Sequence, residues 1–229
     1  MRSISYLSSE FVTITFPENK WRSPTQSRDP PSGRLLEEAH PPGLQPQRPM
    51  AIVHIDVDYF FAQVEEVRDP RLADMPFGVQ QNMEVASVNY IAREHGLYNR
   101  ISVADARRRC PELVLVRGDN GINAMQRYRV ASQRVLQCIM HALDEMGGVG
   151  EAPWESRFVD HPSFDDFFIL FDESCAAQWW RLQPSNCTSE KSVLDAAALW
   201  AQRLRGAVRE ATGLKCSAGV ARSKLLSLL

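Results

Sequence analysis

Proline density divides this chain into two parts of different character. Eight of the 14 prolines in the 229-residue chain precede residue 50, and they are Pro17, Pro24, Pro30, Pro31, Pro41, Pro42, Pro46 and Pro49. Because each proline removes a backbone donor and fixes φ, a segment this rich in proline disfavours both helix and sheet. We therefore expect residues 1–49 to form a mostly disordered extension, in which only 3–7 and 11–16 have the pattern of a short strand. The folded part is predicted to begin at Met50.

From residue 50 onward, the sequence is a mixture of strand-like and helix-like segments. Runs of β-branched and aromatic residues predict strands at 51–55, 77–80, 84–88, 113–116, 164–171 and 216–220. Apolar residues at helical spacing predict helices at 59–68, 89–95, 103–110, 123–146 and 193–212. We expect a loop at 147–162 and an insertion at 175–192. Strands and helices follow one another without strict βαβ alternation, which favours an α+β layered fold.

Composition excludes several other classes of protein. Hydrophobic residues make up 44% of the chain and charged residues 24%, which is typical of a globular protein and not of a collagen-like or wholly disordered one. No apolar run approaches the roughly 18 residues of a membrane-spanning helix, so we expect no membrane partner. The five cysteines are widely spaced without a CxxC pair. This spacing argues against a disulfide framework or a thiolate zinc site and favours a reducing compartment.

The net charge of −2 conceals an uneven distribution of charge along the chain. Residues 86–134 carry nine arginines and four acids, a net charge of +5, whereas residues 141–195 carry three bases and eleven acids, a net charge of −8. A basic part beside an acidic part suits a protein that holds phosphate with one and cations with the other. Two solvated helix faces would give the same pattern, and charge alone favours that simpler interpretation.

Acidic residues at the ends of two predicted strands form the strongest chemical pattern. The first strand runs into Asp56-Val57-Asp58, where acids at i and i+2 of an extended segment share a face. A lone Asp-x-Asp is more often a solvated strand end, but Asp165 and Asp166 head a second, aromatic strand. Two carboxylate clusters on neighbouring strand ends would repel unless a cation lies between them. The pattern therefore suggests the two-metal geometry of nucleotidyl transfer, in which the ions lie roughly 3.5–4 Å apart.

Five segments of the chain resemble, in order, motifs of the Y-family, or translesion, DNA polymerases. They are 55–65 (IDVDYFFAQVE), 76–81 (PFGVQQ), 88–96 (VNYIAREHG), 104–116 (ADARRRCPELVLV) and 216–226 (CSAGVARSKLL). The second segment is especially similar to the iota branch of that family. Each match alone is moderately specific, and the shared order gives the resemblance its weight.

The resemblance implies an α+β polymerase palm, an antiparallel sheet backed by helices, with a small inserted fingers subdomain. Residues 50–60 and 120–229 would form the palm and residues 61–119 the fingers. The thumb and the little finger of the family would follow residue 229, so this chain is expected to lack both and most of the DNA-binding surface with them.

The resemblance also implies a set of metal ligands. Asp56 and Asp165 would bridge two Mg²⁺ or Mn²⁺ ions, and the Val57 carbonyl would ligate the ion on the nucleotide side. Asp166 would lie beside the primer 3′-oxygen, where the family usually has Glu. Because the Asp side chain is shorter by one methylene, the metal geometry would shift by about 1 Å, which can reduce the rate roughly 100-fold.

The nucleotide-binding residues implied by the resemblance lie on the predicted helices and near the end of the chain. Phe61 would be the steric gate that excludes a 2′-hydroxyl, with Phe60 as its neighbouring aromatic candidate. The triphosphate would contact four residues, Ser87, Tyr90, Arg93 and Lys224. Tyr90 and Arg93 share a helix face, so they can hold one phosphate group together. Without the resemblance, all of these residues would be interpreted as core or surface residues.

The function implied by the resemblance is template-directed DNA synthesis past damaged bases. The implied partners are a DNA primer-template, a dNTP, and a sliding clamp reached through regions outside this chain, and the implied location is the nucleus. Two alternatives stay open. The absent thumb and Asp166 favour a catalytically inactive fragment that acts as a binding module. A nucleotidyl cyclase would also use a palm, but the pair of Tyr90 and Arg93 argues against it.

Overall fold

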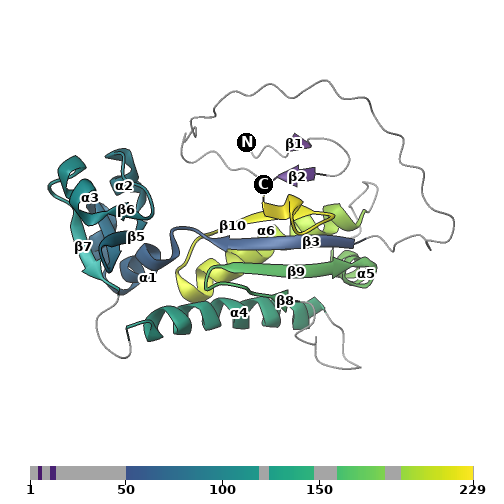
Figure 1. Ribbon diagram of the computed structural model, residues 1–229. Helices are drawn as coiled ribbons and strands as arrows, with labels where there is room; N and C mark the ends of the chain where they lie inside the picture. Colours follow the sequence, from purple (N-terminus) through teal and green to yellow (C-terminus); the bar gives the residue numbers. More distant parts are fainter. Residues whose placement is uncertain are drawn as a thin grey trace, which may run out of the picture.

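The computed structural model describes residues 50–118, 124–146, 159–183 and 192–228, together with the backbone of 5–6 and 11–13. These residues form two sheets with helices packed on them, so the α+β class predicted from the sequence is confirmed (Figure 1). The predicted disorder of 1–49 lies, apart from the two short backbone segments, outside the described residues. No helix in the described part of the chain is long and apolar enough to cross a membrane.

The larger sheet is antiparallel throughout, with strand order β1-β2-β10-β3-β9-β8. Its strands are β1 (Ser5–Tyr6), β2 (Phe11–Thr13), β3 (Met50–Val57), β8 (Val159–Asp160), β9 (Asp166–Asp172) and β10 (Cys216–Ala221). Along β3, side chains alternate between two faces, as period two requires. Ala51, Val53 and Ile55 are fully buried on one face, whereas His54 and Asp56 lie on the other.

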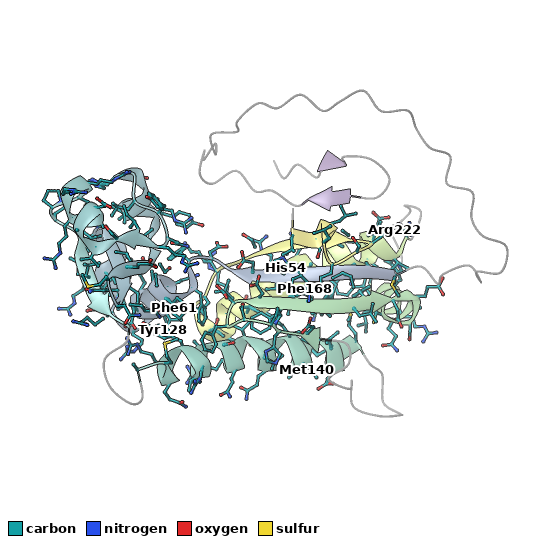
Figure 2. All side chains as sticks on the ribbon, in the orientation of Figure 1. His54, Phe61, Tyr128, Met140, Phe168 and Arg222 are labelled. Carbon is teal, nitrogen blue, oxygen red and sulfur yellow. The ribbon has the colours of Figure 1, made fainter. Side chains whose placement is uncertain are left out.

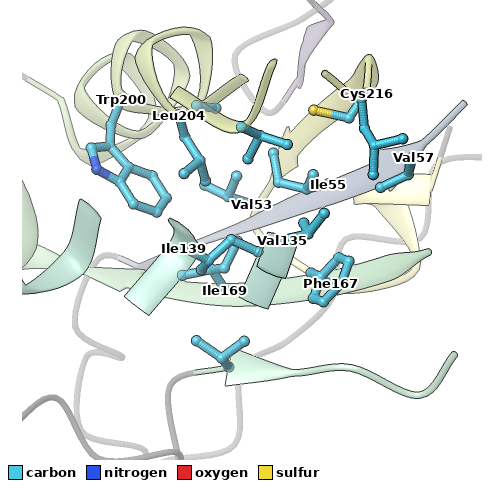
Figure 3. Close-up of a cluster of buried hydrophobic side chains, with 14 of the residues drawn as sticks. Val53, Ile55, Val57, Val135, Ile139, Phe167, Ile169, Trp200, Leu204 and Cys216 are labelled. Carbon is cyan, nitrogen blue, oxygen red and sulfur yellow. The ribbon is translucent and has the colours of Figure 1, made fainter. Parts of the chain in front are cut away.

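Helices cover the face of the sheet that carries Val53 and Ile55. They are α4 (Gln126–Met146), α5 (Glu173–Leu182) and α6 (Val193–Thr212). Figure 3 shows Val53 and Ile55 in one cluster with Trp200 of α6 and Ile139 of α4. Burying one aliphatic side chain stabilises the fold by about 1.5–3 kcal/mol, so this cluster determines which face of β3 turns inward. The opposite face carries His54 and Asp56, together with Ile52 and Phe168.

The smaller sheet has the strand order β6-β5-β4-β7, with β4 and β7 parallel and the other neighbours antiparallel. Its strands are β4 (Phe77–Gln81), β5 (Glu84–Val88), β6 (Ile101–Ser102) and β7 (Val114–Arg117). The helices α2 (Tyr90–Glu94) and α3 (Val103–Arg109) complete a separate small hydrophobic cluster with β5 and β6. Two short 3₁₀ turns, η1 (Pro70–Asp74) and η3 (Leu226–Leu228), complete the described elements.

Helix α1 (Phe60–Arg68) joins the two sheets (Figure 1). It follows β3 through Tyr59, whose left-handed backbone (φ 34°, ψ 48°) turns the chain from strand to helix. Phe77 and Val79 of β4 pack into the larger hydrophobic cluster, so the smaller sheet shares core with the larger one. The boundaries predicted for palm (50–60, 120–229) and fingers (61–119) stay a prediction.

The structure differs from the expected elements mainly around β9. The stretch expected to be an insertion, 175–192, begins inside helix α5, because Cys175, Ala176 and Trp179 recur at helical spacing and are buried. The expected loop at 147–162 contains the short strand β8, while 147–158 lies outside the described residues. Strand β9 begins at Asp166 and not at 164.

Candidate metal and nucleotide site

The strand ends of β3 and β9 bring the predicted acidic residues together. Asp56 lies directly opposite Asp166 in the antiparallel register, two residues from the pair formed by His54 and Phe168. Opposed residues of an antiparallel pair share a face, so both carboxylates lie on the side of the sheet away from the helices. The backbone N–H of Val57 donates to the carbonyl of Asp165 at 3.0 Å, which holds Asp165 at the same end.

The electrostatics of Asp56 show how closely these acids interact. Protein atoms crowd its carboxylate, although the residue remains exposed to solvent on its open side. This desolvation, and then the charges of Asp166 and Asp165, raise the pKa of Asp56 to about 6. A cation between the carboxylates would offset the repulsion, and the open side gives it access. Three carboxylates and the Val57 carbonyl are oxygen ligands, which fit Mg²⁺ or Mn²⁺.

Ser163 contacts both Asp165 and Asp166, and His54 contacts Asp166 from β3. The Ser163 hydroxyl lies 2.7 Å from Asp165 Oδ1 and 2.8 Å from Asp166 Oδ2, and it also accepts the backbone N–H of Asp166 at 3.0 Å. Ser163 thus bonds locally to the residues just before and at the first residue of β9. His54 Nε2 lies 2.9 Å from Asp166 Oδ1.

The contact of His54 with Asp166 is not among the site contacts predicted from the sequence. His54 is 6% exposed, and its ring stacks on Phe168 with centroids 4.4 Å apart (Figure 2). Its position two residues before Asp56 places it on the same face of β3, which the sequence shows, but the contact also requires the register that brings Asp166 of β9 beside it.

Asp58, the other acid of the first pair, is engaged by neighbouring side chains. The Ser217 hydroxyl donates to Asp58 Oδ1 at 2.9 Å, and the Tyr90 hydroxyl donates to Asp58 Oδ2 at 3.4 Å. Gln63 donates to the Asp58 carbonyl at 2.6 Å. Asp58 therefore ties β10 and α2 to the end of β3.

The two adjacent phenylalanines of α1 have different environments. Phe60 is 2% exposed and belongs to the core, whereas Phe61 is half-buried. The Phe61 ring packs edge-on against Tyr128 with centroids 4.7 Å apart (Figure 2). Tyr128 is held by its hydroxyl, which donates to the buried Glu65 at 2.8 Å. Of the two candidates, Phe61 is the more exposed.

Helix α2 places Tyr90 and Arg93 beside the start of α1. The helix begins at Asn89, whose side chain accepts the backbone N–H groups of Ala92 (3.0 Å) and Phe77 (3.2 Å) and so anchors α2 to β4. The guanidinium of Arg93 lies 5.4 Å from the centroid of the Tyr90 ring, as their shared helix face predicts. Tyr90 also packs edge-on against Tyr59 of the turn after β3, at 4.8 Å.

Ser87 and Lys224, the other two predicted phosphate contacts, are not on helix α2. Ser87 is 3% exposed, and its hydroxyl donates to the Tyr59 carbonyl at 3.0 Å. Lys224 forms an ion pair with Asp160, and its ammonium lies 4.1 Å from the centroid of the Phe168 ring. These contacts place Lys224 on the face of the sheet that carries His54. The roles of all ten site residues stay predictions.

Comparisons with known proteins identify the family of this chain. The sequence model of the impB/mucB/samB family matches residues 55–229. DNA polymerase iota of Homo sapiens is 33% identical over 196 residues, covering 78% of this chain and 24% of that protein. DNA polymerase iota of Drosophila melanogaster is 30% identical over 188 residues, with the same two coverages. DNA polymerase IV of Francisella tularensis subsp. holarctica is 32% identical over 180 residues, covering 77% of this chain and 42% of that protein.

A solved structure described as "Dbh Ternary Complex (substrates partially disordered)" has the same fold. It matches with a TM-score of 0.58 and 21% sequence identity, covering 78% of this chain and 43% of that chain. The chain thus spans less than half the length of each of these relatives. The match over residues 55–229 shows that this chain belongs to the impB/mucB/samB family, the family of the Y-family DNA polymerases whose motifs its sequence resembles.

Proposed function

We propose that this chain forms the palm and fingers of a translesion DNA polymerase. The observation that carries the proposal is the register that sets Asp56 opposite Asp166. The carbonyl of the preceding residue, Asp165, accepts a hydrogen bond from the backbone N–H of Val57. The partners are a DNA primer-template and a dNTP, with a sliding clamp bound through regions outside this chain. The proposed location is the nucleus.

The chemistry follows from the ligand set. Asp56, Asp165, Asp166 and the Val57 carbonyl would hold two Mg²⁺ or Mn²⁺ ions, which stabilise charge on the attacking and leaving oxygens of nucleotidyl transfer. Ser163 and His54 fix the direction of the Asp165 and Asp166 carboxylates before ions bind.

The chain's other side chains bind and select the nucleotide. Tyr90 and Arg93 present a hydroxyl and a guanidinium from one face of α2, a pair suited to one phosphate group. The ring of Phe61 would clash with the 2′-hydroxyl of a ribonucleotide. Tyr128 packs against that ring and is itself held by its hydrogen bond to Glu65, so the Phe61 ring is restrained.

A non-catalytic binding module is the second candidate. Asp166 in place of the usual Glu favours it, because His54 and Ser163 hold the shorter carboxylate back against β9. Such a module would bind metal and nucleotide without joining nucleotides to a primer.

Two measurements on the 229-residue chain separate these functions. Calorimetry with Mn²⁺ should show binding that Asp56→Asn abolishes and Asp144→Asn, on the far half of α4, leaves unchanged. Unchanged binding in Asp56→Asn rejects the assigned site for both functions. Primer extension with Mn²⁺ and all four dNTPs then decides between them. Template-directed products that vanish in Asp56→Asn support the polymerase, and metal binding without products supports the module.

A further inference from the structure

The smaller sheet carries a second cluster of metal-ligand side chains. Among the residues that the structure describes, His95, Cys110 and Glu112 are a group whose ligand atoms all lie within 4.8 Å of one another. His95 is the C-cap of α2, Cys110 is the C-cap of α3, and Glu112 lies in the turn before β7. The fold therefore brings the ends of two helices to one point, far from the β3 and β9 aspartates in the sequence.

One separation in this group, between His95 and Glu112, matches that of two ligands of a tetrahedral zinc ion. His95 Nδ1 lies 3.6 Å from Glu112 Oε1, which is too long for a hydrogen bond. Ligands at zinc distances of 2.0–2.3 Å and tetrahedral angles are separated by about 3.3–3.6 Å. The side chains of His95 and Glu112 are 39% and 55% exposed, so they are free to rotate toward the buried Cys110 sulfur. Their solvent-facing side leaves room for a water as fourth ligand.

The chemistry of the three groups points to Zn²⁺. The wide spacing of the cysteines argues against a zinc site built from several thiolates, whereas this group contains one cysteine beside His95 and Glu112. Imidazole and thiolate are ligands that zinc prefers, whereas Mg²⁺ takes oxygen. With a thiolate and a carboxylate, the filled site has no net charge, so it does not repel the neighbouring cation Arg109. That guanidinium is in any case held by the Gly96 carbonyl at 3.0 Å. Burial and the Glu112 charge raise the pKa of the Cys110 thiol, and zinc would displace its proton.

We propose that His95, Cys110 and Glu112 bind a zinc ion that links the end of α2 to the end of α3. This site is separate in chemistry and position from the oxygen-ligand site at Asp56. Because α2 also carries Tyr90 and Arg93, the ion would stabilise the helix that presents them. The proposal does not depend on polymerase activity.

Co²⁺ is the probe that tests this site, because thiolate ligation gives it a charge-transfer band in the near ultraviolet. The 229-residue chain, in excess Mg²⁺ to fill oxygen-ligand sites, is titrated with Co²⁺ and then with Zn²⁺. We expect one equivalent of Co²⁺ to give the band and Zn²⁺ to displace it. Asp56→Asn should keep the band, since its oxygen site is a different one.

Variants at the three ligands decide the outcome. Cys110→Ser should abolish the band, whereas Cys138→Ser, at the half-buried free cysteine of α4, should keep it. Because Cys110 is buried and its variant can fail to fold, His95→Gln and Glu112→Gln provide tests at exposed positions, and each should weaken Co²⁺ binding at least about 10-fold. Zn²⁺ should raise the Tm of the unaltered chain but not of His95→Gln. A band that survives Cys110→Ser, Co²⁺ binding without a band, or unchanged affinity in His95→Gln would each overturn the proposal.

Discussion

Asp166 is held in place by protein groups on two sides, by Ser163 at 2.8 Å and by His54 at 2.9 Å. A carboxylate oriented in this way loses less freedom when an ion binds, which is the usual contribution of outer contacts to a metal site. The His54 ring is itself fixed by stacking on Phe168. The geometry of the acidic cluster therefore depends on residues that are not themselves predicted ligands.

Replacing His54 by Phe tests this dependence. Phenylalanine keeps the stacked ring on Phe168 and removes only the nitrogen that contacts Asp166. We expect Mn²⁺ affinity, measured by calorimetry, to fall about 10-fold while the Tm changes little. Ile52→Val, on the same face of β3, is the control and should leave the affinity unchanged. Equal Mn²⁺ affinity in His54→Phe would show that Asp166 needs no support from His54.

Sequence patterns predict the acids of this site better than the residues around them. Asp56 and Asp166 stand at ends of strongly apolar strands, and that pattern is visible in the chain itself. The contacts of His54 and Ser163 depend on the register of β3 with β9, which no local pattern specifies. The meeting of His95 with Cys110 depends on how two helices end, and helix ends are set by capping in three dimensions.

At the scale of elements, the long helices are predictable because their apolar periodicity is strong. The bounds 193–212 predicted for α6 are the bounds found, with the Ser192 hydroxyl accepting the Asp195 N–H at 3.1 Å and Gly213 at φ 76° after the last turn. Helix α5 was missed because it follows β9 without a turn, and Asp172 both ends the strand and caps the helix.

Substituting a buried and an exposed leucine of α6 shows how much burial on this helix contributes to stability. Leu204 is 1% exposed and Leu199 is 38% exposed. We expect Leu204→Ala to lower the free energy of unfolding by about 2–5 kcal/mol, because it leaves a cavity between α6 and the larger sheet. Leu199→Ala, with the same change of side chain and helix propensity, should cost less than about 1 kcal/mol. Urea denaturation of both variants checks this, and similar losses would contradict the packing of α6.

Glycine at β10 marks a close approach of two backbones. A Cβ added at Gly219 would overlap the backbone carbonyl of Ser227 in η3, whereas a Cβ at Gly206 in α6 meets no atom within 4 Å. Gly219→Ala should therefore destabilise the protein by about 1–3 kcal/mol, since the clash forces η3 away from the sheet. Gly206→Ala should stabilise it by about 0.5–1 kcal/mol, through helix propensity alone. Thermal unfolding of both variants gives opposite shifts in Tm if this packing is correct.

At the scale of the whole molecule, the two charged stretches of the sequence map to different ends of the structure. The basic stretch, 86–134, contains α2, α3 and β7 of the smaller sheet and the first part of α4, and the acidic stretch, 141–195, contains the end of α4 with β8, β9 and α5 of the larger sheet (Figure 1). The simpler interpretation, two solvated helix faces, stays open beside a role in binding phosphate. A phosphate backbone would approach the smaller sheet and avoid the outer end of the larger one.

Salt dependence of DNA binding tests this division of charge. Arg107 lies exposed on α3, and Arg181 lies exposed on α5 at the acidic end. If the smaller sheet contacts the DNA backbone, Arg107→Gln should weaken primer-template binding severalfold at low salt and reduce the slope of log K against log salt by about 1. Arg181→Gln removes the same charge from the other end and should change neither quantity. Fluorescence anisotropy with labelled duplex over a salt series measures both, and equal effects of the two substitutions would mean that DNA responds only to net charge.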